Sequence, residues 1–257
     1  MLQAHFQKNS TSPGRAKAAE SKRQLPKQSF ENMLRSLHAW ISKLHPADTG
    51  KSVWQDYDQE HSYQDDEFRA KLNFVSDFVQ ETRPDMLWDI GCNTGEFSEA
   101  ALKSGASLVV GFDADHGALE KAFARAEEKD LNLLPLYMDL ANPSPDQGWD
   151  QRERAGLQGR AQANAIIALA VIHHMAISGN IPLAHGVRWL VGLAPRGVIE
   201  FVPKSDPMVQ ALLALREDIF ADYAEDTFTE ALQSGARITR SETISATGRK
   251  LFWYDRS

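Results

Sequence analysis

The spacing of apolar residues predicts two helices in the first third of the chain. From Phe30 to Leu44 an apolar side chain recurs every three or four residues, and residues 66–81 repeat this spacing, which is typical of amphipathic helices. Residues 1–29 are rich in Ser, Gln, Lys and Ala and hold little that could be buried. We therefore expect a disordered basic tail over residues 1–29 and a helical extension over residues 30–82.

After Pro84 short apolar runs alternate with helical segments, which is typical of a parallel α/β sheet. The predicted elements are strands at 86–90, 107–113, 133–138, 165–171 and 197–202 and helical structure at 207–233. Two final apolar runs, at 236–244 and 249–255, predict an antiparallel hairpin that closes the sheet. The sequence therefore predicts an α/β domain over residues 83–257, with a seven-stranded, mostly parallel sheet and helices on both faces.

The length and charge of the chain limit its function. With 257 residues, 42% of them hydrophobic, the chain can form one sizeable core. Its formal net charge of −7 argues against a general nucleic-acid binder, because phosphate binding needs clustered positive charge. Six Lys and Arg residues but only one acid lie within residues 1–30, so the rest of the chain is more acidic still.

The cysteine content and the lack of long apolar runs indicate where the protein works. The single cysteine, Cys92, excludes an intrachain disulfide and a cysteine-rich metal site. No apolar run approaches the roughly 18–20 residues needed to cross a bilayer, and the N-terminus lacks the apolar core of a signal peptide. We therefore expect a cytoplasmic protein with no metal ion and no membrane association.

The sequence LWDIGCNTGEF places a glycine turn after the first predicted strand. A dinucleotide-binding turn has the pattern G-x-G-x-x-G, because its backbone must approach a pyrophosphate at a helix N-terminus. Counted from Gly91, the second glycine is replaced by Asn93 and the third by Glu96. Glu96 and the nearby Asp89 would both repel a pyrophosphate. The turn therefore favours a cofactor with a cationic end over NAD.

This turn resembles motif I of the class I S-adenosylmethionine-dependent methyltransferases, commonly D-x-G-C-G-T-G. The chain matches that motif at Asp89, Gly91, Cys92, Thr94 and Gly95. It departs from the motif at Asn93, where glycine is usual. Asparagine tolerates left-handed dihedral angles better than other residues with side chains, so the departure is mild.

Later segments resemble the same family in the same order. The second predicted strand ends in VVGFDAD, which places Asp113 at the position of the family's ribose-binding acid. The third ends in LYMDL, where Asp139 matches an acid that often lies beside the adenine amino group. VIHHM and LAPRGVIEF resemble the family's vlHHl and LkPGG segments. Together these matches cover residues 85–202.

The resemblance implies that the chain binds S-adenosylmethionine. The residues at the matching positions are Asp89, Gly91, Cys92, Asn93, Gly95, Asp113, Ala114, Asp139 and Leu140. Three of them also have simpler structural interpretations. Asp113 could cap a helix, Asp139 could start a turn, and Cys92 could be a small packing residue.

The segment from 199 to 228, with Trp54, Tyr57 and Tyr63, resembles a bacterial methyltransferase subgroup related to nodulation-associated proteins. The resemblance implies transfer of a methyl group from S-adenosylmethionine to an O or N acceptor, with the helical extension as a lid over the cofactor. We expect a small-molecule acceptor, because the acidic body disfavours nucleic acid. The alternative is a non-catalytic module that holds the cofactor without turnover.

Two histidines, His173 and His174, are candidates for a general base. They follow the fourth predicted strand, whose carboxyl end should face the methyl group of the cofactor. A neutral imidazole could accept a proton from the acceptor near neutral pH. The alternative is that both cap the strand or pack under the next helix. Similarly, the loop at 203–206 could contact the substrate, or Asp206 could cap the next helix with Pro207 in its first position.

Overall fold

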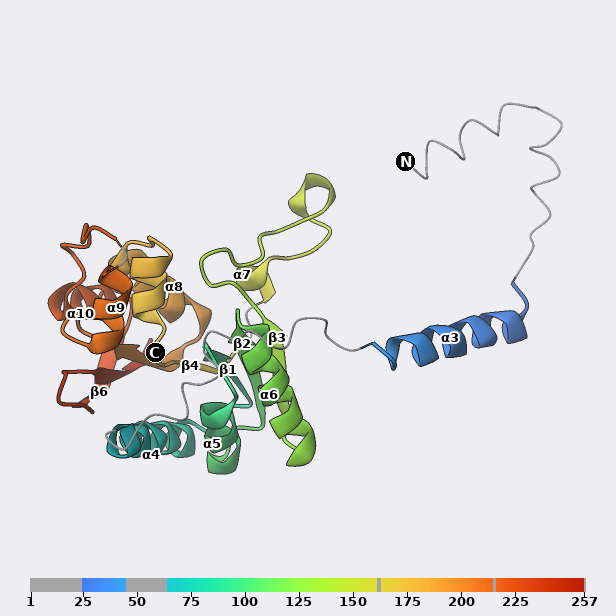
Figure 1. Cartoon of the computed structure of the whole chain (residues 1–257), viewed down its shortest axis with the longest axis horizontal. Helices are drawn as coiled ribbons and strands as arrows, with labels where there is room; N and C mark the ends of the chain where they lie inside the picture. Colours follow the sequence, from blue (N-terminus) through green and yellow to red (C-terminus); the bar gives the residue numbers. More distant parts are fainter. Residues whose placement is uncertain (1–24, 45–63, 161–162, 215, 257) are drawn as a thin grey trace. The chain divides into compact units, whose positions relative to one another are not determined.

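The computed structural model describes residues 25–44, 64–160, 163–214 and 216–256. Most of the predicted tail, and the aromatic residues between positions 45 and 63, lie outside the described residues. The chain divides into two compact units, Met1–Ala47 and Asp48–Ser257. Figure 1 shows both units coloured along the sequence.

The first unit contains helix α3, Lys27–Ile41, which corresponds to the helix predicted from Phe30 to Leu44. It begins directly after Pro26 and therefore includes the last three residues that we assigned to the tail. None of its residues is buried. Its apolar side chains, from Phe30 to Ile41, are exposed along one stripe of the helix.

The second unit is built on a seven-stranded sheet with the order β3-β2-β1-β4-β5-β7-β6. The strands are β1 (Met86–Ile90), β2 (Leu108–Asp113), β3 (Leu133–Tyr137), β4 (Ala165–Ala168), β5 (Arg196–Phe201), β6 (Arg237–Thr243) and β7 (Lys250–Asp255). β1 to β5 are parallel, and β7 pairs antiparallel with both β5 and β6. The predicted fold is therefore confirmed, including the closing hairpin.

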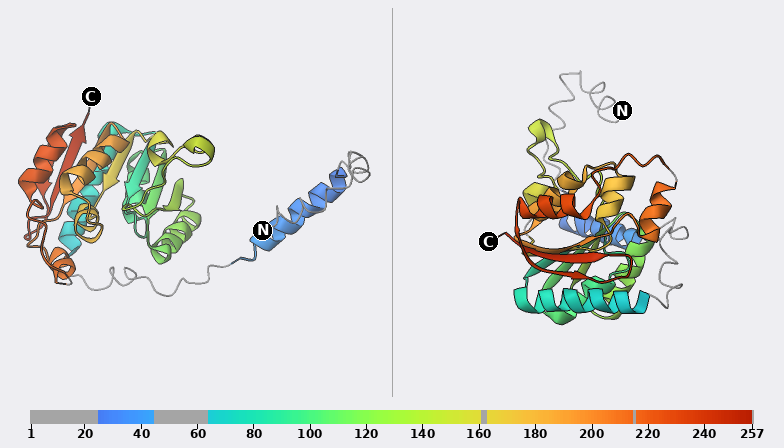
Figure 2. Two further views of the ribbon diagram at one scale, coloured as in Figure 1. Left: turned by 90° about the horizontal axis from the view of Figure 1, so that it is seen from above. Right: turned by 90° about the vertical axis from the view of Figure 1, so that its left-hand side faces the viewer.

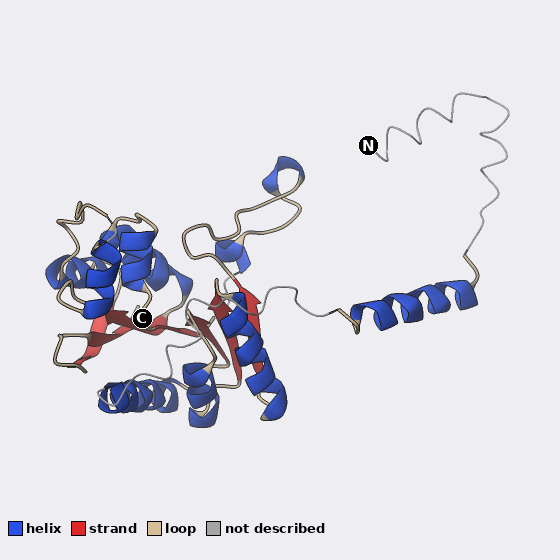
Figure 3. Cartoon of the chain, in the orientation of Figure 1, coloured by secondary structure: helices blue, strands red, loops and turns tan. Residues whose placement is uncertain are grey.

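Helices cover both faces of this sheet, as Figures 2 and 3 show. One face carries α4 (Gln64–Thr82), α5 (Glu96–Ser104) and α6 (His116–Glu128). The other carries the short α7 (Leu157–Arg160), α8 (Leu183–Leu193), α9 (Pro207–Leu213) and α10 (Glu225–Gln233). Two short helical turns, η1 (Trp149–Gln151) and η2 (His174–Ser178), lie in the loops after β3 and β4. Among the described helices, none is long and apolar enough to span a membrane.

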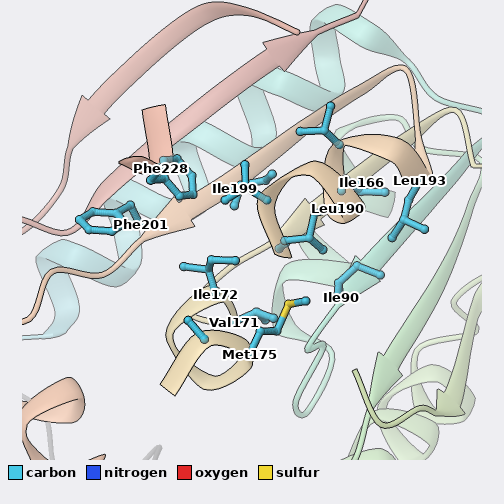
Figure 4. Packing of buried hydrophobic residues seen from close by; sticks show 14 of the residues in the cluster. Ile90, Ile166, Val171, Ile172, Met175, Leu190, Leu193, Ile199, Phe201 and Phe228 are labelled. Carbon is cyan, nitrogen blue, oxygen red and sulfur yellow. The ribbon is translucent and has the colours of Figure 1, made fainter. Parts of the chain in front are cut away.

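Apolar side chains fill the space between these helices and the sheet. On the α4 face, the rings of Phe78 and Trp253 meet edge to face with their centroids 5.1 Å apart. On the other face, Ile166 of β4 lies in one cluster with Leu190 of α8 and Phe228 of α10 (Figure 4). This double layer holds the carboxyl ends of β1 to β5 along one edge of the sheet.

Helix α4 is part of the second unit. Its four sheet-facing residues are at most 1% exposed: Phe74, Val75, Phe78 and Val79. The sequence predicts one helical extension over residues 30–82, whereas the boundary between the two compact units falls between Ala47 and Asp48. The reason is that the apolar face of α4 is buried against the sheet.

The helical structure predicted over residues 207–233 consists of two helices, since α9 ends at Leu213 and α10 starts at Glu225. The connecting segment is anchored by aromatic residues: Phe220 and Tyr223 are buried, and the hydroxyl of Tyr223 donates to the carbonyl of Val202 at 2.7 Å. These contacts hold the segment between α9 and α10 in a non-helical conformation.

Candidate active site

The glycine turn joins β1 to α5 in left-handed backbone conformations. The φ angles are 76° at Gly91, 47° at Asn93 and 81° at Gly95. A Cβ atom on Gly91 would lie 2.5 Å from Cγ2 of Val171, so the turn needs glycine there both for its dihedral angle and for its close approach to the loop after β4. Asn93 adopts a left-handed conformation, which asparagine tolerates better than other residues with side chains.

Gly95 is in contact with protein on its Cβ side. A Cβ atom there would lie 3.1 Å from Cδ2 of Leu133 and 3.4 Å from Cβ of Ala122. The missing side chain therefore allows the turn to pack against β3 and α6. A larger residue at Gly95 would disturb this packing as well as any ligand that the turn holds.

Asp89 is buried beneath the turn, with 2% of its surface exposed. The hydroxyl of Ser98 donates to Oδ2 of Asp89 at 2.6 Å. Burial raises the pKa of Asp89 to about 7, and the neighbouring Asp113 contributes to this rise. A buried carboxyl group of this kind is suited to pair with a cation, because a nearby positive charge favours its ionised form.

Asp113 ends β2 and ties that strand to the turn. Its Oδ2 accepts the backbone N–H of Asn93 at 2.9 Å, and its Oδ1 accepts that of Asp115 at 2.9 Å. The cap of α6 is Asp115, which accepts the backbone N–H groups of Gly117 and Ala118. The interpretation of Asp113 as the helix cap is therefore wrong. Ala114, which lies between Asp113 and Asp115 in the sequence, is exposed.

Asp139 and Leu140 follow β3 at the same edge of the sheet. The backbone N–H of Met138 donates to the carbonyl of Asp113 at 2.8 Å, which holds the end of β3 beside the end of β2. Oδ1 of Asp139 accepts the backbone N–H of Ala141 at 2.8 Å, so Asp139 starts a turn, as its simpler interpretation predicted. Leu140 packs on the apolar cluster below α8.

Cys92 is a packing residue at the turn. Its side chain is buried, and its Sγ lies 2.8 Å from the place that a Cβ atom on Gly111 would occupy. Burial, with the nearby carboxylates of Asp89 and Asp113, raises the pKa of the Cys92 thiol, so the thiol stays protonated at neutral pH.

Arg125 of α6 contacts the glycine turn and stabilises it. Arg125 donates from Nε to the carbonyl of Thr94 at 2.9 Å and pairs with Glu96 at 3.1 Å and with Glu99 at 2.8 Å. The charge of Glu96 is therefore compensated, and Glu96 repels an anion less than its position in the sequence suggested.

The two histidines lie where the chain leaves β4. Ala170 has a left-handed φ of 51°, which ends the strand earlier than predicted and turns the chain into η2. His173 is 1% exposed, and its Nδ1 has no hydrogen-bond partner among the described residues. The rings of His173 and His174 are 4.1 Å apart. Burial lowers the pKa of both imidazoles, so both are neutral at pH 7.

Four buried charged residues and the partly exposed Glu67 form a linked group whose charges act on His173. The four buried members are Lys71, Glu200, Asp206 and Arg249. Lys71 Nζ pairs with Glu200 at 3.0 Å, and Arg249 donates to both oxygens of Asp206 at 2.7 and 2.9 Å. Oε2 of Glu200 accepts the backbone N–H of Ala170 at 2.9 Å. The group therefore fixes the left-handed residue that turns the chain towards His173.

Sequence reasoning had identified only Asp206 in this group. The available signals were charges inside apolar runs: Glu200 in GVIEFV and Arg249 before KLFWY. Asp206 also caps α9, since its Oδ1 accepts the backbone N–H of Met208 at 3.0 Å with Pro207 in the first helical position. The cap interpretation is confirmed. Although burial opposes it, the hydrogen bonds from Arg249 hold the pKa of Asp206 below its usual value.

Solved methyltransferase structures have folds similar to this one, in agreement with the sheet order. The magnesium protoporphyrin IX methyltransferase of Synechocystis PCC 6803, solved with bound SAH, has a TM-score of 0.55 at 19% identity, covering 87% of this chain and 95% of that one. The N-methyltransferase NodS of Bradyrhizobium japonicum WM9 has a TM-score of 0.55 at 13% identity, covering 80% and 93%. The protein has the class I S-adenosylmethionine-dependent methyltransferase fold.

Comparison of sequences is more specific. The nodulation protein NoeA of Rhizobium meliloti strain 1021 is 45% identical over 259 residues, which cover the whole of this chain and 54% of NoeA. The ribosomal protein L11 methyltransferase of Shewanella sp. strain ANA-3 is 29% identical over 126 residues, 41% of this chain and 42% of that protein. No family model matches the chain. The resemblance to nodulation-associated methyltransferase-like proteins is confirmed, and the chain spans about half the length of these relatives.

Proposed function

We propose that the protein is an S-adenosylmethionine-dependent methyltransferase that acts on an O or N atom of a small molecule. The observation that carries this proposal is the concentration of hydrogen-bond acceptors around the glycine turn. Asp89, Asn93 and Asp113 bring carboxyl and amide oxygens to the carboxyl end of β1 and β2. A ligand at this turn must supply donors or positive charge.

The donor groups of S-adenosylmethionine match these acceptors. Asp89, Gly91 and Asn93 would hold its amino-acid end, Asp113 and Ala114 its ribose, and Asp139 and Leu140 its adenine. When bound, the cofactor supplies a methyl group that is already activated on a sulfonium. The neighbouring folds in the comparisons include methyltransferases solved with SAM or SAH, which supports this choice of cofactor.

The chain itself has to align the acceptor and, where the acceptor carries a proton, remove it. His173 is the candidate for proton removal, because its imidazole is neutral at pH 7 and its Nδ1 is buried without a partner in the described structure. His174, 4.1 Å away between ring centroids, is the second candidate. An acceptor that binds already deprotonated needs only alignment.

A small acceptor in the cytoplasm of a bacterium fits the remaining observations. The net charge of −7 disfavours a nucleic-acid backbone. The matched relatives are bacterial proteins, and the single cysteine, which is buried, fits a reducing compartment.

The test is methyl transfer from labelled S-adenosylmethionine into bacterial cell extract, which is then separated into small molecules, RNA and protein. We expect label in a small molecule with the wild-type protein and far less with Asp113→Ala at the same, subsaturating cofactor concentration. Incorporation into RNA or protein would redirect the acceptor class. Cofactor binding without transfer to any extract component would support the non-catalytic module instead.

A further inference from the structure

Helix α3, drawn in blue in Figure 1, carries an apolar stripe that the described structure leaves uncovered. Large apolar side chains share one face of this helix, and each is at least 46% exposed: Phe30, Met33, Leu34, Leu37, Trp40 and Ile41. A helix of 15 residues is only marginally stable in water by itself, because most helical stability comes from packing of the apolar face. The stripe therefore indicates a contact with an apolar partner surface.

The residues around this stripe carry a positive charge. α3 and the residues that follow it hold Lys27, Arg35 and Lys43 against one acid, Glu31, and Nζ of Lys27 lies 3.8 Å from Oε1 of Glu31. Eight Lys and Arg residues but only two acids lie within residues 1–44, whereas the rest of the chain holds 20 and 33. The partner of this segment should therefore be acidic, and a second copy of the segment would be repelled.

The basic residues lie where a helix in a membrane surface needs them. At about 3.6 residues per turn, Lys27 and Lys43 fall on opposite flanks of the stripe, and Arg35 falls on the face behind it. Long basic side chains on the flanks reach the lipid phosphates while their aliphatic stems cover apolar surface. An apolar stripe opposite a basic face is the pattern of helices that lie in the plane of the membrane interface.

We propose that α3 binds the surface of a membrane that contains acidic lipids, with the apolar stripe among the acyl chains and the flanking lysines at the phosphate groups. The absence of a long apolar run predicted no membrane association. No described helix is able to span a membrane, but a helix that lies in the surface plane needs no such run. The proposal does not depend on the methyltransferase activity of the second unit.

The test is co-sedimentation of the full chain with lipid vesicles. We expect binding to vesicles of phosphatidylglycerol and phosphatidylcholine in equal parts, weaker binding at high salt, and little binding to phosphatidylcholine alone. Equal binding to both kinds of vesicle, or binding to neither, overturns the proposal.

A matched pair of neutral substitutions separates insertion of the stripe from general attraction. Leu37→Gln removes an apolar side chain from the stripe and should weaken binding to the acidic vesicles about 10-fold. Ala39→Gln changes the opposite face of the helix and should leave this binding nearly unchanged. The melting temperature should stay at the wild-type value in both variants, because neither side chain is buried. Equal losses of vesicle binding in the two variants contradict an inserted stripe.

A second pair of variants tests the charge. Arg35→Gln combined with Lys43→Gln removes two positive charges and should weaken binding to the acidic vesicles about 30-fold. Arg188→Gln combined with Arg237→Gln is the control, because it removes two exposed charges from the second unit. The control should bind like the wild type. Equal losses in the two double variants would assign the attraction to the net charge of the whole chain and overturn the proposal.

Trp40, which is 61% exposed, reports directly on insertion. Lipids brominated in their acyl chains should quench the fluorescence of the wild-type protein more than that of Trp40→Phe, which keeps an apolar ring at this position. Equal quenching of the two proteins contradicts insertion. A wild-type dimer that Leu37→Gln dissociates, measured by analytical ultracentrifugation, would assign the stripe to a second copy of the chain and likewise overturn the proposal.

Discussion

Asp89 is a carboxyl group that the fold keeps protonated at a pH where an aspartate in water is ionised. Its pKa is about 7 because the side chain is buried, with Asp113 nearby. The folded-state pKa of Asp89 exceeds the ordinary value of 3.8. The free energy of unfolding should therefore decrease as the pH rises from about 4 to 7, because only the unfolded chain ionises this carboxyl group in that range. A bound cation would reverse this, because it pairs with the ionised form.

Cofactor affinity should therefore depend on pH through Asp89. Between pH 6 and 8 the affinity for SAH should rise, because the ammonium group binds the ionised carboxylate, and binding below pH 7 should release a proton. Titrations in buffers of different ionisation enthalpy measure that release. Asp89→Asn should bind more weakly and lose the dependence on pH in this range. The same slope in Asp89→Asn would assign the titration to another group.

Asp113 should contribute most to cofactor affinity. Hydrogen bonds to a charged group contribute about 1.5–3 kcal/mol, so Asp113→Ala should lower the affinity for SAH by about 10- to 150-fold. It should also lower stability, since the backbone N–H groups of Asn93 and Asp115 lose their acceptor. Asp115→Ala is the control: loss of the α6 cap costs about 1 kcal/mol but should leave the affinity nearly unchanged. Equal losses of affinity in both variants would argue against a ribose contact by Asp113.

At the scale of elements, the buried charges beside His173 join parts of the chain that are far apart in sequence. Lys71 comes from α4, Glu200 from β5 and Arg249 from the residue directly before β7. Through Glu200 the group holds Ala170, and so the turn from β4 into η2. Removing one member leaves the others buried without compensation.

Arg249→Ala should accordingly destabilise the protein by about 3–5 kcal/mol, because Glu200 and Asp206 lose a buried partner. The control is Arg196→Ala: the pair between Arg196 and Asp255 is partly exposed at 3.3 Å and should contribute about 0–1 kcal/mol. Chemical denaturation of both variants gives the comparison. Similarly small losses of unfolding free energy in Arg249→Ala and Arg196→Ala would mean that the buried group contributes little to stability.

The elements were predictable where apolar spacing alone determines them. All seven strands follow from short apolar runs, but β4 ends at Ala168 because Ala170 is held left-handed by a contact with Glu200 that is 30 residues distant in sequence. The spacing of apolar residues in α4 predicted a helix, but it did not show that this helix packs against the sheet. The buried charges were missed for the same reason, since their pairing exists only in the folded chain.

At the scale of the whole molecule, the second unit contains all the buried residues of both apolar clusters. Removal of residues 1–47 should therefore leave the melting temperature of the α/β unit and its affinity for SAH nearly unchanged. Differential scanning calorimetry and SAH titration of the shortened chain measure both. A clear drop in either quantity would show that the first unit stabilises the fold or helps to hold the cofactor.

The central claim is that the acceptor-rich turn selects an S-adenosyl cofactor over a dinucleotide. The most direct measurement is a calorimetric titration of the purified full chain with SAH and, in parallel, with NAD. We predict saturable binding of SAH at one site per chain, weakened in Asp113→Ala, and no measurable binding of NAD at the same concentrations. Binding of NAD in preference to SAH would contradict the account.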